Sequence, residues 1–317
     1  MGLVERRDRG VIRHAGSVYG MSVEGIPLTI YLPESGKADT VILNAIHGDE
    51  AETTVVASEA LRCIPVGDLA AAVILCGNPD GMLRGTRGNS RGVDLNRNFP
   101  TSNWNRDPVH YKSRANDARD IALSPGSEPA SEPETKALLA LLDRLKPRAV
   151  VSLHSALACV DDAGASRLGR QLAERSALPF LTEIGYPTPG SMGTWAGEQR
   201  LNLVTLELED ASLYALKDRH VPILIDLMTG RFDLEEVYGW FPFLRERARQ
   251  RGGTLSGGQQ EMLAIARALI NGPDLLLLDE PSDGVQPSII QEIGTFILGL
   301  VEKKAIGVLL VEQNIDL

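Results

Sequence analysis

The amino-acid sequence predicts an α/β fold followed by a second, partial α/β block. Between residues 26 and 230, short β-rich runs alternate with helical stretches, the pattern of a layered sandwich around a parallel or mixed sheet. The character of the sequence changes near residue 232, where a further helix–strand–helix–strand pattern begins without a long linker. We therefore expect one domain over residues 1–231 and another over residues 232–317.

Five apolar runs of the first block predict strands buried on both faces, because they are almost continuously apolar. They lie at residues 29–32, 40–46, 70–76, 149–154 and 202–208. Residues 50–63 and 132–145 predict helices with acidic residues near their starts, where the helix dipole favours negative charge. The connection at 78–131 is long and rich in Gly, Pro, Asn, Ser and Arg, and connections of this length are usually functional.

The composition predicts a cytoplasmic protein that neither binds nucleic acid nor inserts into a membrane. The 317 residues include 32 basic and 42 acidic side chains, whereas nucleic acid and anionic lipid attract clustered Lys and Arg. No run of about 18 apolar residues occurs, and the first residues lack the apolar core of a secretory signal. The three cysteines form no CxxC pair, which fits a reducing compartment.

The segment HGDE, residues 47–50, offers two metal ligands directly after a predicted strand. His47 and Glu50 are separated by two residues, so both can point at one ion from a strand-to-helix turn. His154 ends another predicted strand and can reach the same ion. Two imidazoles and a carboxylate suit Zn²⁺ and leave a fourth position for water, as in catalytic zinc sites. The sequence therefore predicts a hydrolytic zinc centre.

A zinc hydrolase also needs a group that takes a proton from the attacking water and returns it. Glu207, at the end of a third predicted strand, is the candidate for this general base. Glu209, two residues further on, points to the same face of a strand and competes with it.

The long connection contains VDLNRNFP, residues 93–100, which supplies Asn96 and Arg97. Arg87 and Arg91 lie close by in the sequence. Guanidinium groups suit two-pronged binding of a carboxylate, so this segment predicts a substrate-binding loop.

Five motifs in this order, IHGDE, NPDG, RGVDLNRNFP, SLH and TLELE, resemble the zinc carboxypeptidase family over about residues 12–231. PGSEPASEPET (125–135) and GYPTPGSMGTW (185–195) are most similar to its murein peptide amidases, which cleave the γ-D-glutamyl–diaminopimelate bond of peptides recycled from the cell wall. The resemblance implies an α/β/α sandwich with a mixed central sheet, Zn²⁺ as cofactor and a small peptide, a muropeptide, as substrate.

The same resemblance implies roles for individual residues. His47, Glu50 and His154 would be the zinc ligands, and Glu207 the general base. Tyr186 would cover the substrate. The substrate carboxylate or the oxyanion would be bound by Arg87, Asn96 and Arg97. One departure is Ser155, after the ligand His154, where an acidic residue is expected in relatives.

Residues 232–317 resemble the ATPase subunits of ABC transporters of the urea and branched-chain amino-acid type. LSGGQQ (255–260) matches the signature loop, and LLLLDEP (275–281) matches the Walker B strand. The resemblance implies γ-phosphate contacts from Ser256, Gly257, Gly258 and Gln259, and roles for Asp279 and Glu280 at magnesium and the attacking water.

The nucleotide-binding half of that machinery is missing from this sequence. No GxxxxGK[ST] occurs in the 317 residues, and Gln313 stands where many such ATPases have a histidine. We therefore expect a partial ATPase fragment without ATPase activity of its own.

The leading prediction is a zinc carboxypeptidase or amidase acting on small peptides. An alternative zinc hydrolase is a deacylase of the aspartoacylase or succinylglutamate-desuccinylase type, which shares HxxE and a distant His. An alternative of another class is a nucleotide-binding module of an ABC transporter. A further hypothesis is that the tail offers its intact LSGGQQ loop to a complete transporter ATPase.

Overall fold

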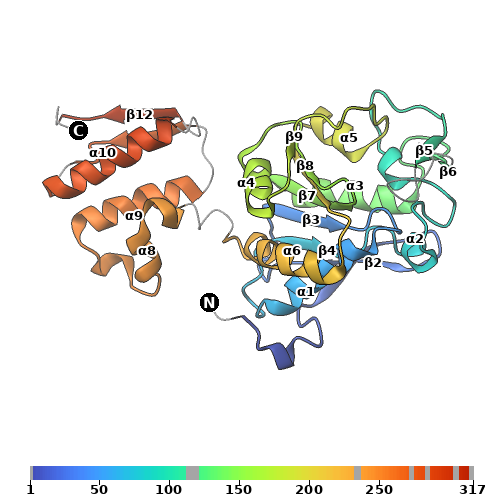
Figure 1. Ribbon diagram of the computed structural model, residues 1–317, viewed down its shortest axis with the longest axis horizontal. Coiled ribbons are helices and arrows are strands. Elements are labelled where there is room, and N and C mark those ends of the chain that lie inside the picture. Colours follow the sequence, from blue (N-terminus) through green and yellow to red (C-terminus); the bar gives the residue numbers. More distant parts are fainter. Residues whose placement is uncertain are drawn as a thin grey trace. The chain divides into compact units, whose positions relative to one another are not determined.

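The computed structural model describes residues 3–111, 121–231, 237–270, 275–282, 286–302 and 307–313. The chain divides into two compact units, Met1–Gly230 and Arg231–Leu317 (Figure 1). Within the described ranges, every helix is too short or too polar to cross a bilayer.

A mixed eight-stranded sheet forms the first unit, in the order β1-β2-β4-β3-β7-β10-β8-β9. Its members are β1 (Gly16–Met21), β2 (Pro27–Tyr31), β3 (Thr40–Asn44), β4 (Ala72–Ile74), β7 (Ala149–Ser155), β8 (Cys159–Asp161), β9 (Phe180–Leu181) and β10 (Asn202–Leu208). The four central strands β4, β3, β7 and β10 run parallel, whereas β1–β2, β2–β4 and β8–β10 pair antiparallel. The predicted mixed sheet is confirmed.

Helices cover both faces of this sheet, as an α/β/α sandwich requires (Figure 1). One face carries α3 (Pro133–Leu145) and α5 (Met192–Glu198), and the other carries α1 (Ala51–Cys63), α4 (Arg167–Ser176) and α6 (Leu213–Met228). The core on the α3 side includes Val41, Leu43, Val150, Leu138, Leu141 and Leu142. Leucines spaced three and four residues apart place one apolar stripe of α3 on the sheet.

The remaining elements of the first unit are short. They are η1 (Arg6–Asp8), α2 (Pro79–Arg84), η2 (Leu95–Arg97), β5 (Val109–Tyr111) and β6 (Ile121–Leu123). All but η1 lie in the long connection at 78–131. β5 and β6 pair antiparallel in a small sheet of their own.

The predicted strand at 70–76 is shorter in the structure, where β4 spans only Ala72–Ile74. The backbone N–H groups of Ala70 and Ala71 instead donate to the carbonyl oxygen of Met228, at 2.8 and 3.1 Å. Because these two N–H groups bond to the end of α6, residues 70 and 71 do not join the sheet, and β4 begins at Ala72.

The carboxyl ends of β3, β7 and β10 meet at one edge of the sheet because these strands are parallel neighbours. Asn44 pairs in register with Leu153, and Glu207 pairs with His154. This edge therefore brings together the segment after β3 and the ends of β7 and β10, where the predicted zinc ligands and general base lie.

The second unit contains α8 (Pro242–Glu246), η3 (Gly252–Thr254), α9 (Gly257–Ile270), β11 (Leu275–Asp279), α10 (Pro287–Glu302) and β12 (Gly307–Val311). β11 and β12 form a parallel two-stranded sheet. Leu276 and Leu278 are buried in its core with residues of α9 and α10. The other face of the pair carries Leu275 and Leu277, which are 56% and 65% exposed.

Candidate active site

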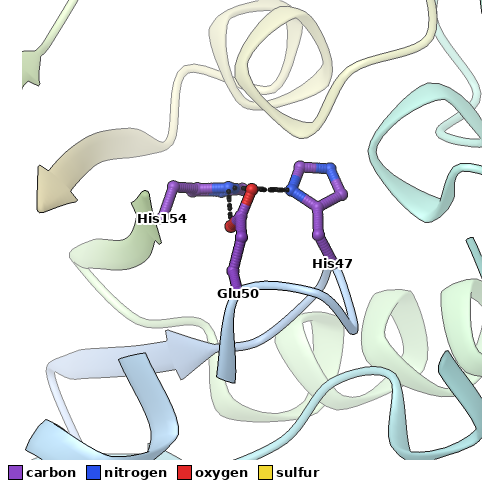
Figure 2. A group of neighbouring side chains, drawn as sticks. All are labelled: His47, Glu50 and His154. Carbon is purple, nitrogen blue, oxygen red and sulfur yellow. Dashed lines mark hydrogen bonds and ion pairs between the residues drawn. The ribbon is translucent and has the colours of Figure 1, made fainter. Parts of the chain in front are cut away.

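His47, Glu50 and His154 converge on one buried point at the carboxyl edge of the sheet (Figure 2). Nδ1 of His47 lies 2.8 Å from Oε1 of Glu50, and Nδ1 of His154 lies 3.1 Å from its Oε2. The two Nδ1 atoms are 3.1 Å apart. No side chain of the three is more than 6% exposed. The potential ligand atoms all lie within 4.8 Å of one another, so one ion can reach all of them.

The outer nitrogen of each imidazole lies beside an oxygen of another side chain. Nε2 of His47 lies 3.3 Å from Oδ1 of Asp94, and Nε2 of His154 lies 3.0 Å from Oγ of Ser152. Both oxygens can accept an imidazole N–H, which leaves a lone pair on each Nδ1. Two lone pairs facing each other beside a carboxylate suit a shared cation, and the donor set of two imidazoles and one carboxylate fits Zn²⁺.

Glu50 serves this group as a carboxylate anion. Burial alone would raise its pKa, but the facing His47 and His154 hold the pKa of Glu50 well below its usual range. Arg87 adds a further positive charge, since its Nη1 donates to Oε1 of Glu50 at 2.9 Å.

The local fold explains how two residues of HGDE reach one ion. Ala45 has φ of 46°, so the chain turns sharply after β3. The hydroxyl of Thr53 donates to the carbonyl of Glu50 at 2.8 Å and accepts the N–H of Ala45 at 3.2 Å. This hydroxyl ties the end of β3 to the start of α1 and fixes the turn that carries His47 and Glu50.

Gly48 lies so close to the backbone of α2 that it has no room for a side chain. A Cβ on Gly48 would lie 2.1 Å from the carbonyl carbon of Gly81. The Gly48 N–H also donates to the carbonyl of Arg87 at 3.2 Å, and the side-chain amide of Asn78 donates to the same oxygen at 3.1 Å. This close approach places Arg87 against the metal group, the name used here for His47, Glu50 and His154.

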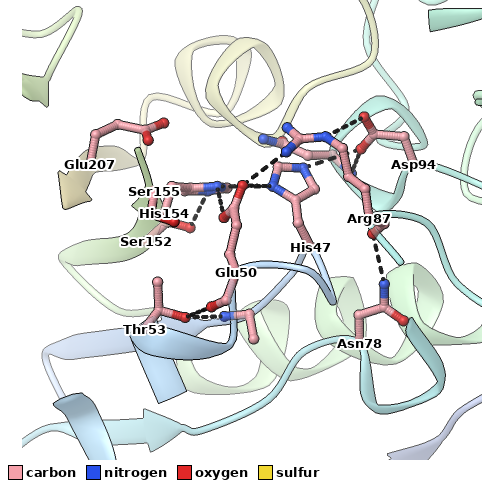
Figure 3. A network of polar contacts seen from close by, with 12 residues as sticks. His47, Glu50, Thr53, Asn78, Arg87, Asp94, Ser152, His154, Ser155 and Glu207 are labelled. Atoms are coloured by element: carbon pink, nitrogen blue, oxygen red, sulfur yellow. Dashed lines mark hydrogen bonds and ion pairs between the residues drawn. The ribbon is translucent and has the colours of Figure 1, made fainter. Parts of the chain in front are cut away.

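Arg87 and Asp94 form the side of the site next to His47 (Figure 3). Nε of Arg87 lies 3.6 Å from Oδ2 of Asp94, and its guanidinium lies 5.2 Å from the centre of the Tyr111 ring. Burial would lower the pKa of Arg87, but the carboxylates of Glu50 and Asp94 raise it. Arg87 is therefore a permanent cation beside the metal group, and its side chain is 20% exposed.

Glu207 lies on the opposite side of the site, beside His154 (Figure 3). It pairs with His154 in register between β10 and β7, and the N–H of Leu157 approaches its Oε2 at 3.5 Å. Burial raises the pKa of Glu207 above its ordinary value, as does Glu50 to a smaller extent. A carboxylate with a raised pKa next to a metal group is suited to accept a proton.

Glu209, the competing carboxylate, is committed to other partners. Its Oε2 accepts from Nε2 of the buried His220 at 2.8 Å, and its Oε1 lies 3.0 Å from Nη1 of Arg219. This engagement favours Glu207 as the general base, although the role stays a prediction.

The predicted substrate-binding loop is held in place by its own contacts. The side-chain carbonyl of Asn96 accepts the N–H of Met192 at 2.8 Å, while Nη1 of Arg97 donates to the carbonyl of Asn96 at 2.7 Å. The side chain of Arg91 is 56% exposed, and its Nη1 pairs with Glu132 at 3.4 Å. Tyr186 lies in the segment before α5 and is 39% exposed.

The structure adds residues that the sequence analysis did not single out. Asp94 and Ser152 contact the outer nitrogens of the two histidines, and Thr53 fixes the turn at Glu50. Asp94 stands inside VDLNRNFP and Ser152 inside SLH, so their proximity in sequence to Asn96 and His154 was a usable signal. Ser155, the departure noted above, donates its hydroxyl hydrogen to Glu52.

The predicted nucleotide motifs occupy two places in the second unit. LSGGQQ leads into α9, where the Gln259 N–H approaches the Ser256 hydroxyl at 3.4 Å, and Gly257 and Gly258 begin the helix. Asp279 ends β11, and the following Glu280 accepts a hydrogen bond from the side-chain amide of Gln313.

Comparison with known proteins relates the tail to transporter ATPases. Residues 199–283 match the ABC transporter family model. Over 81 residues the chain is 54% identical to the high-affinity branched-chain amino acid transport ATP-binding protein BraG of Pseudomonas aeruginosa. The alignment covers 26% of this chain and 34% of that protein, so the chain spans about a third of this relative.

The larger part of the chain is similar to metallopeptidases. Residues 66–160 match the zinc carboxypeptidase family model. The chain is 39% identical over 225 residues to murein peptide amidase A of Escherichia coli (strain K12), covering 70% of this chain and 93% of that protein. The crystal structure of murein-tripeptide amidase MpaA from Escherichia coli O157 matches with a TM-score of 0.70 at 37% identity, covering 72% of this chain and 98% of that one. This chain therefore belongs to the zinc carboxypeptidase family.

Proposed function

We propose that residues 1–230 hydrolyse small peptides of the murein type, at the γ-D-glutamyl–diaminopimelate bond. The observation that carries the proposal is the convergence of His47, Glu50 and His154 at the strand edge that also bears Glu207. The similarity to murein peptide amidase A over nearly the whole of that relative supports the substrate class. Murein recycling inside the cell would place the enzyme in the cytoplasm.

The three ligands would hold Zn²⁺, which when bound activates water and polarises the scissile carbonyl. Glu207 takes the proton of the attacking water and returns it to the leaving nitrogen. Burial raises the pKa of Glu207, which favours acceptance of that proton.

Cationic and amide groups on the His47 side would orient the substrate. Arg87, already adjacent to Glu50, faces the negative charge that develops on the carbonyl oxygen. Asn96 and Arg97 would bind the carboxylate at the carboxyl end of the peptide. Tyr186 would close over the bound peptide from the segment before α5.

The alternative within zinc hydrolases is a deacylase acting on N-acyl amino acids. Zinc content and turnover of the purified full chain separate the two, with a γ-D-glutamyl-diaminopimelate peptide and N-acetyl-aspartate or N-succinyl-glutamate as substrates. We expect one zinc per chain and cleavage of the peptide. Turnover of an N-acyl amino acid with no cleavage of the peptide would establish the deacylase instead.

For the second unit we propose contact with a complete ABC ATPase subunit through the LSGGQQ loop at the start of α9. The support is the 54% identity to a transporter ATP-binding protein in this segment. Size-exclusion of the full chain with such a subunit, ATP and magnesium tests the idea. Separate elution of the two proteins under these conditions would rule it out.

A further inference from the structure

Tyr111 lies against the guanidinium group of Arg87, and no step of the proposed reaction uses it. The central carbon of the guanidinium lies 5.2 Å from the centre of the Tyr111 ring. Within about 6 Å the electron-rich face of an aromatic ring attracts a cation, and the attraction strengthens where water is excluded. Because the Arg87 side chain is only 20% exposed, this contact acts on a largely buried cation.

Two carboxylates contact the same guanidinium group along its edges (Figure 3). Nη1 donates to Oε1 of Glu50 at 2.9 Å, and Nε lies 3.6 Å from Oδ2 of Asp94. The second contact is an ion pair without a hydrogen bond, since Nε has no hydrogen-bond partner among the described residues. No hydrogen bond of Nη2 is found in the described part of the chain either, so this nitrogen can donate to a bound substrate.

The strand that carries Tyr111 is bonded to the segment that carries Asp94. Tyr111 ends β5, which pairs antiparallel with β6. Directly after β6, the N–H of Ser124 donates to the carbonyl of Gly92 at 3.0 Å, and its carbonyl accepts the N–H of Asp94 at 2.9 Å. The ring and one of the two carboxylates that flank Arg87 therefore belong to one hydrogen-bonded unit.

We propose that Tyr111 is a positioning residue for Arg87, whose guanidinium plane it fixes so that Nη2 points at the carbonyl oxygen of the scissile bond. Without the ring, the guanidinium can tilt about its contacts with Glu50 and Asp94. A hydrogen bond weakens steeply as its donor loses alignment, so a tilt costs stabilisation of the developing oxyanion. The inference rests on the proposed function, because it starts from the role of Arg87 at that oxygen.

Two variants separate the face of the Tyr111 ring from its hydroxyl. With the γ-D-glutamyl-diaminopimelate peptide and the zinc-loaded full chain, Tyr111→Leu should lower kcat about tenfold, the effect of losing a buried cation–π contact. KM should stay within about twofold, because Tyr111 acts through Arg87 and not on the bound substrate. Tyr111→Phe keeps the aromatic face and should restore kcat.

Phe180→Leu is the matched control. Phe180 lies in β9, and the guanidinium of Arg170 lies over its ring at the same 5.2 Å. This variant removes an equivalent contact elsewhere in the first unit and should keep the kcat of the wild type. A raised KM with unchanged kcat in Tyr111→Leu would show that the ring binds substrate, and would overturn the inference. An equal fall of kcat in Tyr111→Phe or in Phe180→Leu would overturn it as well.

A double-mutant cycle shows whether Tyr111 acts through Arg87. In the background of Arg87→Gln, the further change Tyr111→Leu should leave kcat within about twofold, because the ring has no cation left to orient. If the two losses instead multiply in the double variant, the residues act independently and the positioning role is wrong.

A chemical probe separates this inference from the proposed function. Phenylglyoxal modifies accessible guanidinium groups, and peptide mapping gives its rate at Arg87 whether or not any peptide is cleaved. The rate should rise in Tyr111→Leu and stay at the wild-type value in Tyr111→Phe. Equal rates in the wild type and Tyr111→Leu would overturn the inference. The expected rates together with a wild type that cleaves no peptide would count against the proposed function alone.

Discussion

The Nδ1 atoms of His47 and His154 lie 3.1 Å apart, although 107 residues separate the two histidines in the sequence. β3 and β7 are parallel neighbours, so the segment after one strand and the end of the other reach the same point. Each ring turns its outer nitrogen toward an oxygen of Asp94 or Ser152 and its inner nitrogen toward the other ring. This orientation is what a bound metal ion requires, and it leads to the first prediction.

Replacing His154 by Gln should reduce zinc content well below one per chain and abolish peptide hydrolysis. The variant removes one of three protein ligands and leaves Glu50 with a single facing imidazole. Metal analysis after dialysis measures the effect. His110→Gln, which changes an exposed histidine of β5, should retain its zinc, and equal zinc in both variants would contradict the ligand role.

Replacing Glu207 by Gln should leave zinc bound and lower kcat by about 10² to 10⁴-fold, the usual contribution of a general base. The amide keeps the size of the side chain but cannot accept the proton. Glu198→Gln is the matched control, because Glu198 is an exposed carboxylate whose partner is Ser102. The measurements are kcat and zinc content of both variants. An unchanged kcat in Glu207→Gln would show that Glu207 is not the general base.

Replacing Asp94 by Asn should weaken zinc binding by about 10- to 100-fold without removing a ligand. Burial would raise the pKa of Asp94, but His47 and Arg87 hold it well below the ordinary value, so Asp94 faces Nε2 of His47 as an anion. Competition with a chromogenic chelator gives the affinity. The exposed Asp107→Asn should bind zinc like the wild type, and a similar loss in both variants would argue against a specific contact.

Acid should destabilise the first unit partly through His220. Burial lowers the pKa of His220 below its ordinary value of 6.5, although Glu209 opposes the shift. Between the lowered pKa and 6.5, the unfolded chain binds a proton that the folded chain does not, so stability falls as pH falls through this window. The free energy of unfolding in urea should therefore drop less steeply below pH 6.5 in His220→Gln. Parallel curves for both proteins would show that His220 is not responsible.

The full chain should bind neither ATP nor ADP at micromolar concentrations. The phosphate-binding GxxxxGK[ST] loop is absent from the 317 residues, and the signature loop alone supplies one side of a nucleotide site. Isothermal titration calorimetry with Mg²⁺ and ATP measures this directly. Saturable binding that Ser256→Ala abolishes would revive the interpretation of the chain as a nucleotide-binding module.

The sequence predicted the strands β7 and β10 well because each lies in a run dominated by apolar and β-branched residues. β10 has the bounds that the pattern indicated, and β7 differs by one residue. β8 and β9 were missed because each has three residues or fewer, too short to show a period. β1 was not predicted because its side chains are exposed or half-buried and its sequence contains no apolar run.

The residues of the metal group could be predicted from the chemistry of metal ligands. The residues that surround it could not, because the fold brings them there from distant parts of the sequence. The motif spacing pointed to His47, Glu50 and His154, which the structure brings together. The contact of Asp94 with His47 requires the loop at 85–94 to fold back over the segment after β3, and sequence spacing does not reveal this. A cavity lined by Glu52, Ala156, Glu209 and Leu216 likewise combines segments that are far apart in the sequence.

The packing of Gly48 against Gly81 has a consequence for how related sequences can vary. A side chain at Gly48 would strike the backbone of Gly81, and one at Gly81 would lie 2.5 Å from the carbonyl oxygen of Gly88. Asp49, in contrast, is exposed and can change without a steric penalty. Related chains that keep this site should therefore retain His, Gly and Glu at the positions of His47, Gly48 and Glu50. The position of Asp49 should vary, so a search motif for such chains should accept any residue there.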